Sequence, residues 1–204
     1  MNKKLFTLLF FISACFTGLK AQTPSQTMQI LDKTAATLNT KGGASANFSI
    51  SGDNIGKTSG TITVKKNKFV AHSPQATIWY NGKTQWTYMK SSNEVNITTP
   101  NEAKQAVMNP YAFVTIYKSG YNMSSSTQGN NYKVHLTAQN TKRPLKELYL
   151  LINKKTYVPS QVKVLQGKNW LTINITNFQK KKISDSVFSF NSKEYPSAEV
   201  IDLR

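Results

Sequence analysis

Cysteine is nearly absent from this sequence, since the single one is Cys15 in the apolar stretch near the N-terminus. Residues 1–21 have the features of an export signal: the lysine pair Lys3-Lys4 at the start, the apolar run Leu5–Phe16, and the small residue Ala21 before the expected cleavage site. Removal of this signal would leave residues 22–204 without cysteine, which excludes disulfides and thiolate-bound metals. We therefore expect an exported protein in which residues 22–204 form one domain.

A lipid anchor at Cys15 is the alternative to simple cleavage. The run Ile12-Ser13-Ala14-Cys15 resembles the motif that directs lipid attachment in bacterial lipoproteins. The apolar run before Cys15 is short, however, and the chain stays mostly apolar up to Leu19, which favours cleavage after Ala21.

Acidic residues and histidines are also scarce, with nine Asp and Glu and two His in the whole chain. The acids are spread out, so nothing in their spacing indicates a pair for general acid–base catalysis. His72 and His135 fall in segments of strand-like pattern, without an HxH or HExxH motif. The sequence also lacks a G-x-S-x-G elbow, a P-loop and a Rossmann glycine pattern. We therefore expect no enzymatic activity, no bound metal and no cofactor.

Arginine is the third scarcity, because Arg143 and Arg204 are the only two among 26 basic residues. The formal net charge is nevertheless +17. Proteins that read nucleic acid favour arginine, whose planar fork makes paired contacts, so we expect no nucleic-acid partner. The lysines are scattered, with the densest runs at residues 65–68 and 180–182, and scattered strand lysines usually solvate an outer face and protect sheet edges. A surface that holds an acidic polymer is the alternative interpretation.

Alternation of apolar and polar residues is what the sequence has in abundance, above all between Ser59 and Pro100. A period of two is typical of strands with one apolar face. Asn81-Gly82 separates two such runs and suits the positive φ angles of a hairpin turn. We expect consecutive hairpins to bring one set of residues onto a single broad apolar surface: Ile62, Val64, Trp86, Tyr88, Val95 and Ile97.

Two segments have helical spacing instead. Apolar residues in Pro24–Leu38 predict a helix with Ser25 as its N-cap. A second helical segment is expected over Asn101–Met108, resuming after Asn109-Pro110 over Tyr111–Lys118. This second segment is richer in apolar residues than a solvent-facing helix requires, so we expect it to fold over one mouth of the sheet.

The second half of the chain returns to strands. Alternating residues predict strands around Val134, Leu150, Val162, Ile173 and finally Val187–Phe190. About ten strands with one apolar face each would curl into a barrel or half-barrel, with the helices inside it. The expected fold class is therefore α+β: one domain, built on a strongly curved antiparallel sheet with an N-terminal helix and a mid-chain helical lid.

Large apolar side chains on both helices and many strands suit such a barrel to holding hydrocarbon rather than small polar metabolites. We expect an acyl chain or lipid anchor as the ligand. The residues expected to line its cavity are Phe48, Ile62, Val64, Phe69, Trp86, Tyr88, Val95, Ile97, Phe113, Ile116 and Tyr117.

Four motifs in order give the chain a resemblance to the LolA family of periplasmic lipoprotein carriers. The segment Ala44–Phe48 is similar to the family's Ser-x-x-Ala-x-Phe entry strand, and Gly60–Lys66 to its Gly-x-Leu/Phe-x-Val-Lys-Arg. The hairpin Asn81–Tyr88 resembles Asp-Gly-Lys-Thr-x-Trp-x-Tyr, and the tail from Phe188 to Asp202 resembles the closing strand. The resemblance runs over nearly all of residues 22–204.

This resemblance implies an incomplete, unclosed barrel of about ten to eleven strands with a helical lid. It also implies a monomer whose cavity takes the acyl chains of lipoprotein cargo from an inner-membrane lipoprotein-releasing transporter and passes them to an outer-membrane acceptor. Lys66 stands where the family places an arginine thought to latch the lid, and lysine lacks the planar fork of arginine. The alternative is a module of the same fold that binds another hydrophobic ligand or senses envelope stress, since fold alone does not fix function.

Overall fold

The computed structural model of the protein describes residues 23–53, 55–101, 110–113, 115–118, 120–143 and 145–204. The expected export signal, the alternative anchor at Cys15 and most of the expected helix Asn101–Met108 lie outside these residues. Within the part that is described, none of the helices has the length and apolar character needed to cross a membrane.

One long helix, twelve strands and several short helical turns make up the described chain. The helical elements are α1 (Pro24–Leu38), α3 (Pro110–Phe113) and the 3₁₀ turns η1 (Ile116–Lys118), η2 (Asp185–Phe188) and η3 (Ser192–Glu194). The strands are β1 (Ala44–Gly52), β2 (Ile55–Lys65), β3 (Lys68–His72), β4 (Ala76–Tyr80), β5 (Gln85–Met89), β6 (Glu94–Thr98), β7 (Tyr121–Gln128), β8 (Asn131–Ala138), β9 (Leu145–Asn153), β10 (Pro159–Gln166), β11 (Asn169–Lys180) and β12 (Glu199–Asp202).

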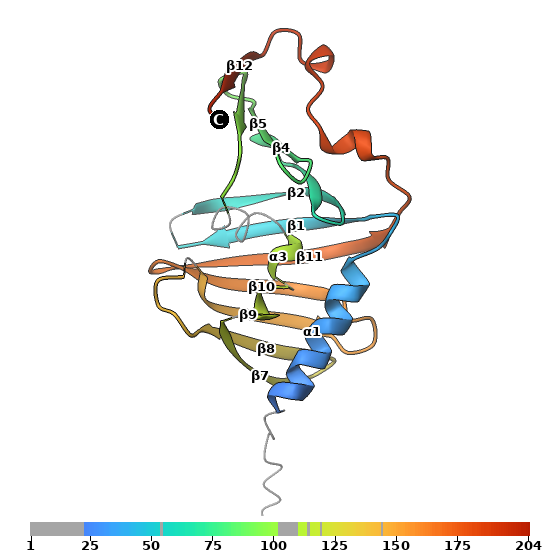
Figure 1. Ribbon diagram of the computed structural model, residues 1–204, viewed down its shortest axis with the longest axis vertical. Helices are drawn as coiled ribbons and strands as arrows, with labels where there is room; N and C mark the ends of the chain where they lie inside the picture. The colour runs from blue at the N-terminus through green and yellow to red at the C-terminus, as the bar shows by residue number, and fades with distance from the viewer. Residues whose placement is uncertain (1–22, 54, 102–109, 114, 119, 144) are drawn as a thin grey trace, which may run out of the picture.

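All twelve strands belong to a single sheet, in the order β12-β6-β5-β4-β3-β2-β1-β11-β10-β9-β8-β7. The edge strands β7 and β12 do not pair with each other, so the sheet is unclosed, as expected from the sequence. The sheet twists strongly, since β4 and β5 are inclined at a steep angle to β1 and β11 in Figure 1. The expected count of ten to eleven strands was too low. The expectation of a wholly antiparallel sheet was also wrong, because β12 pairs with β6 in parallel.

The helix α1 has the predicted bounds but a different N-cap. Thr23 accepts a hydrogen bond from the backbone N–H of Gln26, and the Gln26 side chain accepts one from the backbone N–H of Thr23 at 3.0 Å. This reciprocal pair is a capping box, and Pro24 follows at the start of the helix, where its missing N–H is harmless. Ser25 is therefore inside the helix, and its prediction as the N-cap was wrong.

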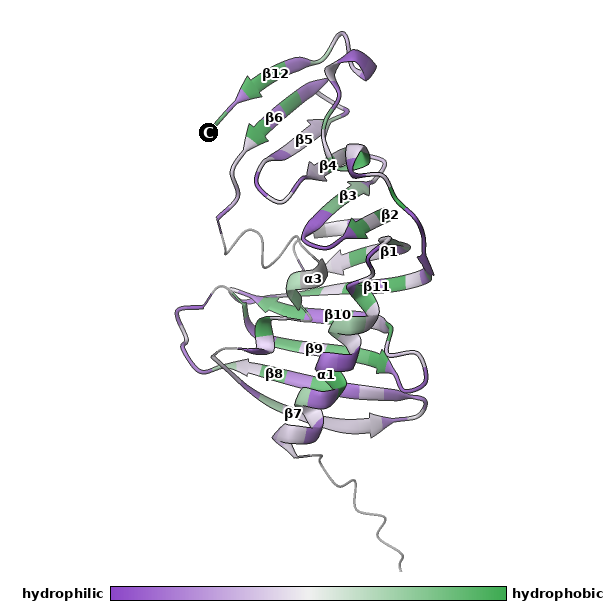
Figure 2. Ribbon diagram, turned by 45° about the vertical axis from the view of Figure 1, so that its right-hand side comes forward, coloured by the Kyte–Doolittle hydropathy of each residue, from purple (hydrophilic) through white to green (hydrophobic). Residues whose placement is uncertain are grey.

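The main core lies between α1 and the strands that it crosses (Figures 1 and 2). Ile30, Leu31 and Ala35 project from one side of the helix because they follow helical spacing. They pack with inward-facing residues of β8–β10, of which these are almost or fully buried: Val134, Leu136, Leu148, Leu150, Ile152, Val162 and Val164. This concave face of the sheet is the one that faces the helix.

The described part of the mid-chain segment is short. It forms α3 and η1 in place of the continuous helix expected over Tyr111–Lys118. Phe113 and Tyr117 are buried, and the Tyr117 hydroxyl donates a hydrogen bond to the carboxylate of Asp32 on α1. These contacts attach the segment to the main core. A helical lid remains a prediction, since residues 102–109 are not described.

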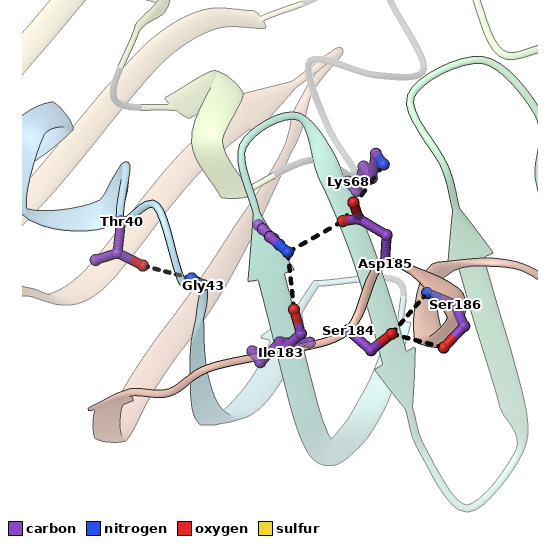
Figure 3. A network of polar contacts seen from close by, with 8 residues as sticks. Thr40, Gly43, Lys68, Ile183, Ser184, Asp185 and Ser186 are labelled. Atoms are coloured by element: carbon purple, nitrogen blue, oxygen red, sulfur yellow. Dashed lines mark hydrogen bonds and ion pairs between the residues drawn. The ribbon is translucent and has the colours of Figure 1, made fainter.

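The C-terminal strap, defined as residues 181–198, leads from β11 in the middle of the sheet to β12 at its edge (Figure 1). Val187 and Phe188 were expected in a strand with Phe190, but they belong to the 3₁₀ turn η2 instead. Asp185 of the strap forms ion pairs with Lys65 (3.2 Å) and Lys68 (3.5 Å), and Lys65 also donates to the Ile183 carbonyl oxygen at 2.8 Å (Figure 3).

Candidate functional site

A cavity of about 310 Å³ opens on the concave face of the sheet. Its walls come from β1–β4 on one side and β10–β11 on the other, with contributions from the end of α1, from α3 and from the β9–β10 loop. The lining residues are Leu38, Ala44, Ser45, Ala46, Phe48, Ile50, Ile62, Val64, Lys66, Phe69, Ala71, Ile78, Phe113, Val158, Pro159, Val162, Leu171, Ile173, Ile175 and Phe178.

Strand alternation builds the floor of this cavity. On β1, residues two apart point to the same face, and Phe48 and Ile50 stand opposite Ile175 and Ile173 of β11. On the other side of β1, Ala46 stands opposite Ile62 of β2. The alanines on this face are part of the reason for the cavity, because their small side chains leave space between the larger ones.

Gly60 allows the close approach of two neighbours in this floor. A Cβ atom at Gly60 would lie 1.8 Å from the His72 carbonyl oxygen and 2.9 Å from the ring of Phe48. No other residue fits there without a shift of its neighbours, so the glycine leaves room for the Phe48 ring beside β2. The resemblance motif beginning at Gly60 thus has a structural reason.

The chemistry of the cavity is that of a hydrocarbon site. Among the described residues of the lining, Ser45 and Lys66 are the only ones with polar side chains. The part of the lining that the structure describes contains no carboxylate or histidine, and no three His, Asp or Glu side chains of the described chain gather as a metal-binding group. A ligand in this cavity would be held by apolar burial, with one cation within reach.

Comparison with known proteins gives the fold a family. The sequence profile described as "Outer membrane lipoprotein carrier protein LolA" matches residues 18–168, which is more than half of the chain. The chain belongs to the LolA family. A search of the curated proteins found no match to this sequence.

Solved structures show the same fold at low sequence identity. An uncharacterized conserved protein from Thermus thermophilus is 13% identical, with a TM-score of 0.59, covering 87% of this chain and 99% of its own. A putative outer membrane lipoprotein-sorting protein domain from Vibrio parahaemolyticus is 9% identical, with a TM-score of 0.50, covering 85% of this chain and 99% of its own. At these identities the likeness supports the fold alone.

Within this LolA-family fold, the structure brings part of the predicted cavity set together. Phe48, Ile62, Val64, Phe69 and Phe113 all line the cavity. Their role in binding an acyl chain stays a prediction. Lys66, the predicted latch, also lines the cavity, from the turn between β2 and β3. Its action on a lid likewise stays a prediction.

The other hairpin residues lie on the opposite face of the sheet. Ile62 stands opposite Ala71, Ala71 opposite Ile78, and Ile78 opposite Thr87. Trp86 and Tyr88, on either side of Thr87, therefore point away from the cavity face. Val95 and Ile97 stand opposite Tyr88 and Trp86, so they lie on the same face of the sheet, away from the cavity. The expectation of one broad surface shared with Ile62 and Val64 was wrong, because in the register of β4 and β5 it is Thr87, between Trp86 and Tyr88, that lies on the cavity face.

The strap covers this opposite face with its own aromatic residues. Phe190 and Tyr195 each lie 5.6 Å from Trp79, centroid to centroid, and Tyr195 lies 4.7 Å from Tyr88. Phe188 is fully buried in the same cluster. Trp86 and Tyr88 are thus part of a second core.

Ile116 and Tyr117, the last two predicted cavity residues, belong to the main core and not to the cavity lining. Conversely, the sequence did not predict the cavity residues of β11, which include Leu171, Ile173 and Ile175. Their alternation was visible, but it does not say that β11 pairs with β1, as the structure shows. The alanines at positions 44 and 46, on the same face of one strand, were the feature of the sequence that could have indicated empty space beside that strand.

Proposed function

We propose that this protein is an extracytoplasmic, non-enzymatic carrier that binds the acyl chains of lipoproteins in its cavity and carries them from the inner to the outer membrane. The observation that supports this is the cavity itself: of the twenty described residues that line it, eighteen have apolar side chains. Membership of a family described as outer membrane lipoprotein carriers supports the cargo, and the signal-like N-terminus supports a periplasmic location.

The energetics suit a carrier. Burial of one methylene contributes about 0.8 kcal/mol, so ten buried methylenes would contribute about 8 kcal/mol before the cost of ordering the chain. That corresponds to a dissociation constant of about 1 μM or weaker. Such an affinity keeps the cargo in solution and still lets it leave for a better site.

Transfer in this proposal follows differences in affinity between partners. The protein, as a monomer, would accept cargo from an inner-membrane lipoprotein-releasing transporter and lose it to an outer-membrane acceptor. No cofactor is required, because no bond is made or broken.

Filling the cavity tests the proposal. Ala71 lines the cavity and is half-buried, so Ala71→Trp would place an indole in the space of the acyl chain. We expect the affinity for a triacylated lipopeptide to fall by about tenfold or more, because the indole removes apolar area from the ligand. The measurement is a soluble one-to-one complex after detergent removal, quantified by titration.

The matched control is Ala36→Trp on the exposed side of α1. It should leave both affinity and thermal unfolding unchanged. If Ala71→Trp folds normally and binds the lipopeptide as well as Ala36→Trp does, the cavity is not the acyl-chain site.

Depletion in the cell separates a carrier from a sensor of the same fold. A carrier should leave lipoproteins stranded in the inner membrane when it is depleted, with arrest of growth. A sensor or a binder of another lipid should change gene expression or lipid content while lipoproteins still reach the outer membrane, and that result would overturn the transport role.

A further inference from the structure

Lys66 is the one charged residue among those described in the wall of the cavity. It is exposed, so its amine lies where the cavity meets solvent. It follows Val64 by two residues and precedes Phe69, and both of these line the cavity. No ion pair to Lys66 is found among the described residues, in contrast to its neighbours Lys65 and Lys68.

A second lysine lies on the cavity side at the same end of the sheet. Lys180 follows the lining residue Phe178 by two residues, and it stands opposite Ala44, whose other neighbour in the sheet is Val64. Alternation therefore places the Lys180 side chain on the cavity face, just beyond the lining. Lys180 is exposed, and no carboxylate pairs with it within the described ranges.

Other lysines surround this end of the cavity. The backbone of Gly43 accepts a hydrogen bond from Lys181 N–H at 3.0 Å, which brings Lys41 and the run 180–182 together. The Asp185 carboxylate is at this end too, but it binds Lys65 and Lys68 on the opposite face. The cavity side of this end thus carries positive charge that the described carboxylates leave uncompensated, and such a field attracts anions.

We propose that, among ligands with the same acyl chain, the cavity prefers those with an anionic group beside the chain, so that the chain fills the cavity and the phosphate or carboxylate lies between Lys66 and Lys180. This inference rests on the proposed acyl-chain binding and adds the charge of the cargo. Burial of the chain supplies the affinity, and the two amines select among headgroups.

The test compares two single-chain lipids with the same 14-carbon chain, used as monomers below their critical micelle concentration. Lysophosphatidylglycerol is anionic and lysophosphatidylcholine is zwitterionic. Each displaces N-phenyl-1-naphthylamine, an uncharged fluorescent probe, from the purified protein. We expect the anionic lipid to act at about five- to tenfold lower concentration, with the ratio shrinking in high salt because the contact is electrostatic.

The variants assign the preference to the two amines. Lys66→Gln and Lys180→Gln should each reduce the ratio, and the double variant should bring it to about one. Lys66→Arg should keep the ratio, since it keeps the charge. Lys168→Gln is the control, because this exposed lysine precedes β11, whose far end carries Lys180. A preference that survives the double variant overturns the proposal.

The remaining outcomes separate this inference from the proposed function. Equal action of both lipids on the wild-type protein overturns the headgroup preference and leaves acyl-chain binding standing. Failure of both lipids to displace a bound probe overturns acyl-chain binding itself. Inorganic phosphate, added against sodium chloride of equal ionic strength, should have no specific effect. If it removes the preference, the amines form a site for free phosphate and the proposal is wrong.

Discussion

The two ends of the sheet bury opposite faces. In the main half, defined as β7–β11 with β1 and β2, the concave face is apolar, and its β8–β11 part packs against α1. In the edge half, defined as β3–β6 with β12, the aromatic residues Trp79, Trp86 and Tyr88 lie on the other face, under the strap. The same alternating pattern therefore serves two cores, and the element that covers each face decides which side becomes the interior.

The cavity lies where the two arrangements meet. On β3 and β4 both faces are apolar: Phe69 and Ile78 line the cavity, while Val70 and Trp79 pack under the strap. Leu38, the last residue of α1, also lines the cavity, so the covering helix ends there. An apolar concave face that extends past its covering helix thus produces the candidate ligand site.

Removal of the anchor of the strap should have the largest effect. Phe188 is fully buried between the strap and the edge half, and Phe188→Ala should lower the free energy of unfolding by about 3–5 kcal/mol. Phe178→Ala makes the same truncation in the cavity wall, where Phe178 is only half-buried, and should cost about 1–2 kcal/mol. Urea unfolding of both variants measures the difference, and equal losses would contradict the assignment of Phe188 to a closed core.

Truncation on the covered face of the edge half should separate stability from binding. Trp86→Ala should lower the free energy of unfolding by about 2 kcal/mol, because Trp86 is partly buried against the second core. The affinity for a triacylated lipopeptide should stay within about twofold of wild type. Denaturation and lipopeptide titration of one preparation give both values. A large loss of affinity in a folded variant would mean that the two faces of the sheet are coupled.

The ion pairs of the strap should contribute least, because Asp185 is exposed. The hydrogen bond from Lys65 and the nearby Lys68 charge hold the pKa of the Asp185 carboxyl below its usual value of 3.8. A carboxyl whose pKa is lowered in the folded state stabilises the protein at pH values above its unfolded-state pKa. This stabilisation is lost as the pH falls through the lowered pKa of the folded state. Asp185→Asn should therefore lower the unfolding midpoint slightly at neutral pH and hardly at all in acid. Thermal unfolding at both pH values tests this, and a larger effect in acid would reverse the sign.

Local patterns predicted the elements well. The helical spacing gave α1 its bounds, and Asn81-Gly82 marks the turn between β4 and β5, where Gly82 has φ 99° and the Asn81 side chain accepts hydrogen bonds from Lys83 and Thr84 N–H. The prediction failed at Val187–Phe190, where apolar residues look like a strand but anchor the strap to the second core. A short apolar run does not distinguish a strand from a buried connection, because both need the same side chains.

Strand alternation and helical spacing are properties of the chain alone, and together they were enough to predict one curved sheet with a helix and more apolar surface than a simple core requires. These local patterns were also enough to predict five members of the cavity wall, among them Phe48 from a strand and Phe113 from the mid-chain helical segment. That Trp86 and Tyr88 face the strap, and that Ile175 stands opposite Phe48, became visible only in three dimensions. The physical reason is that alternation fixes the faces of one strand, whereas the register and the covering elements, which are long-range contacts, fix which face becomes the interior.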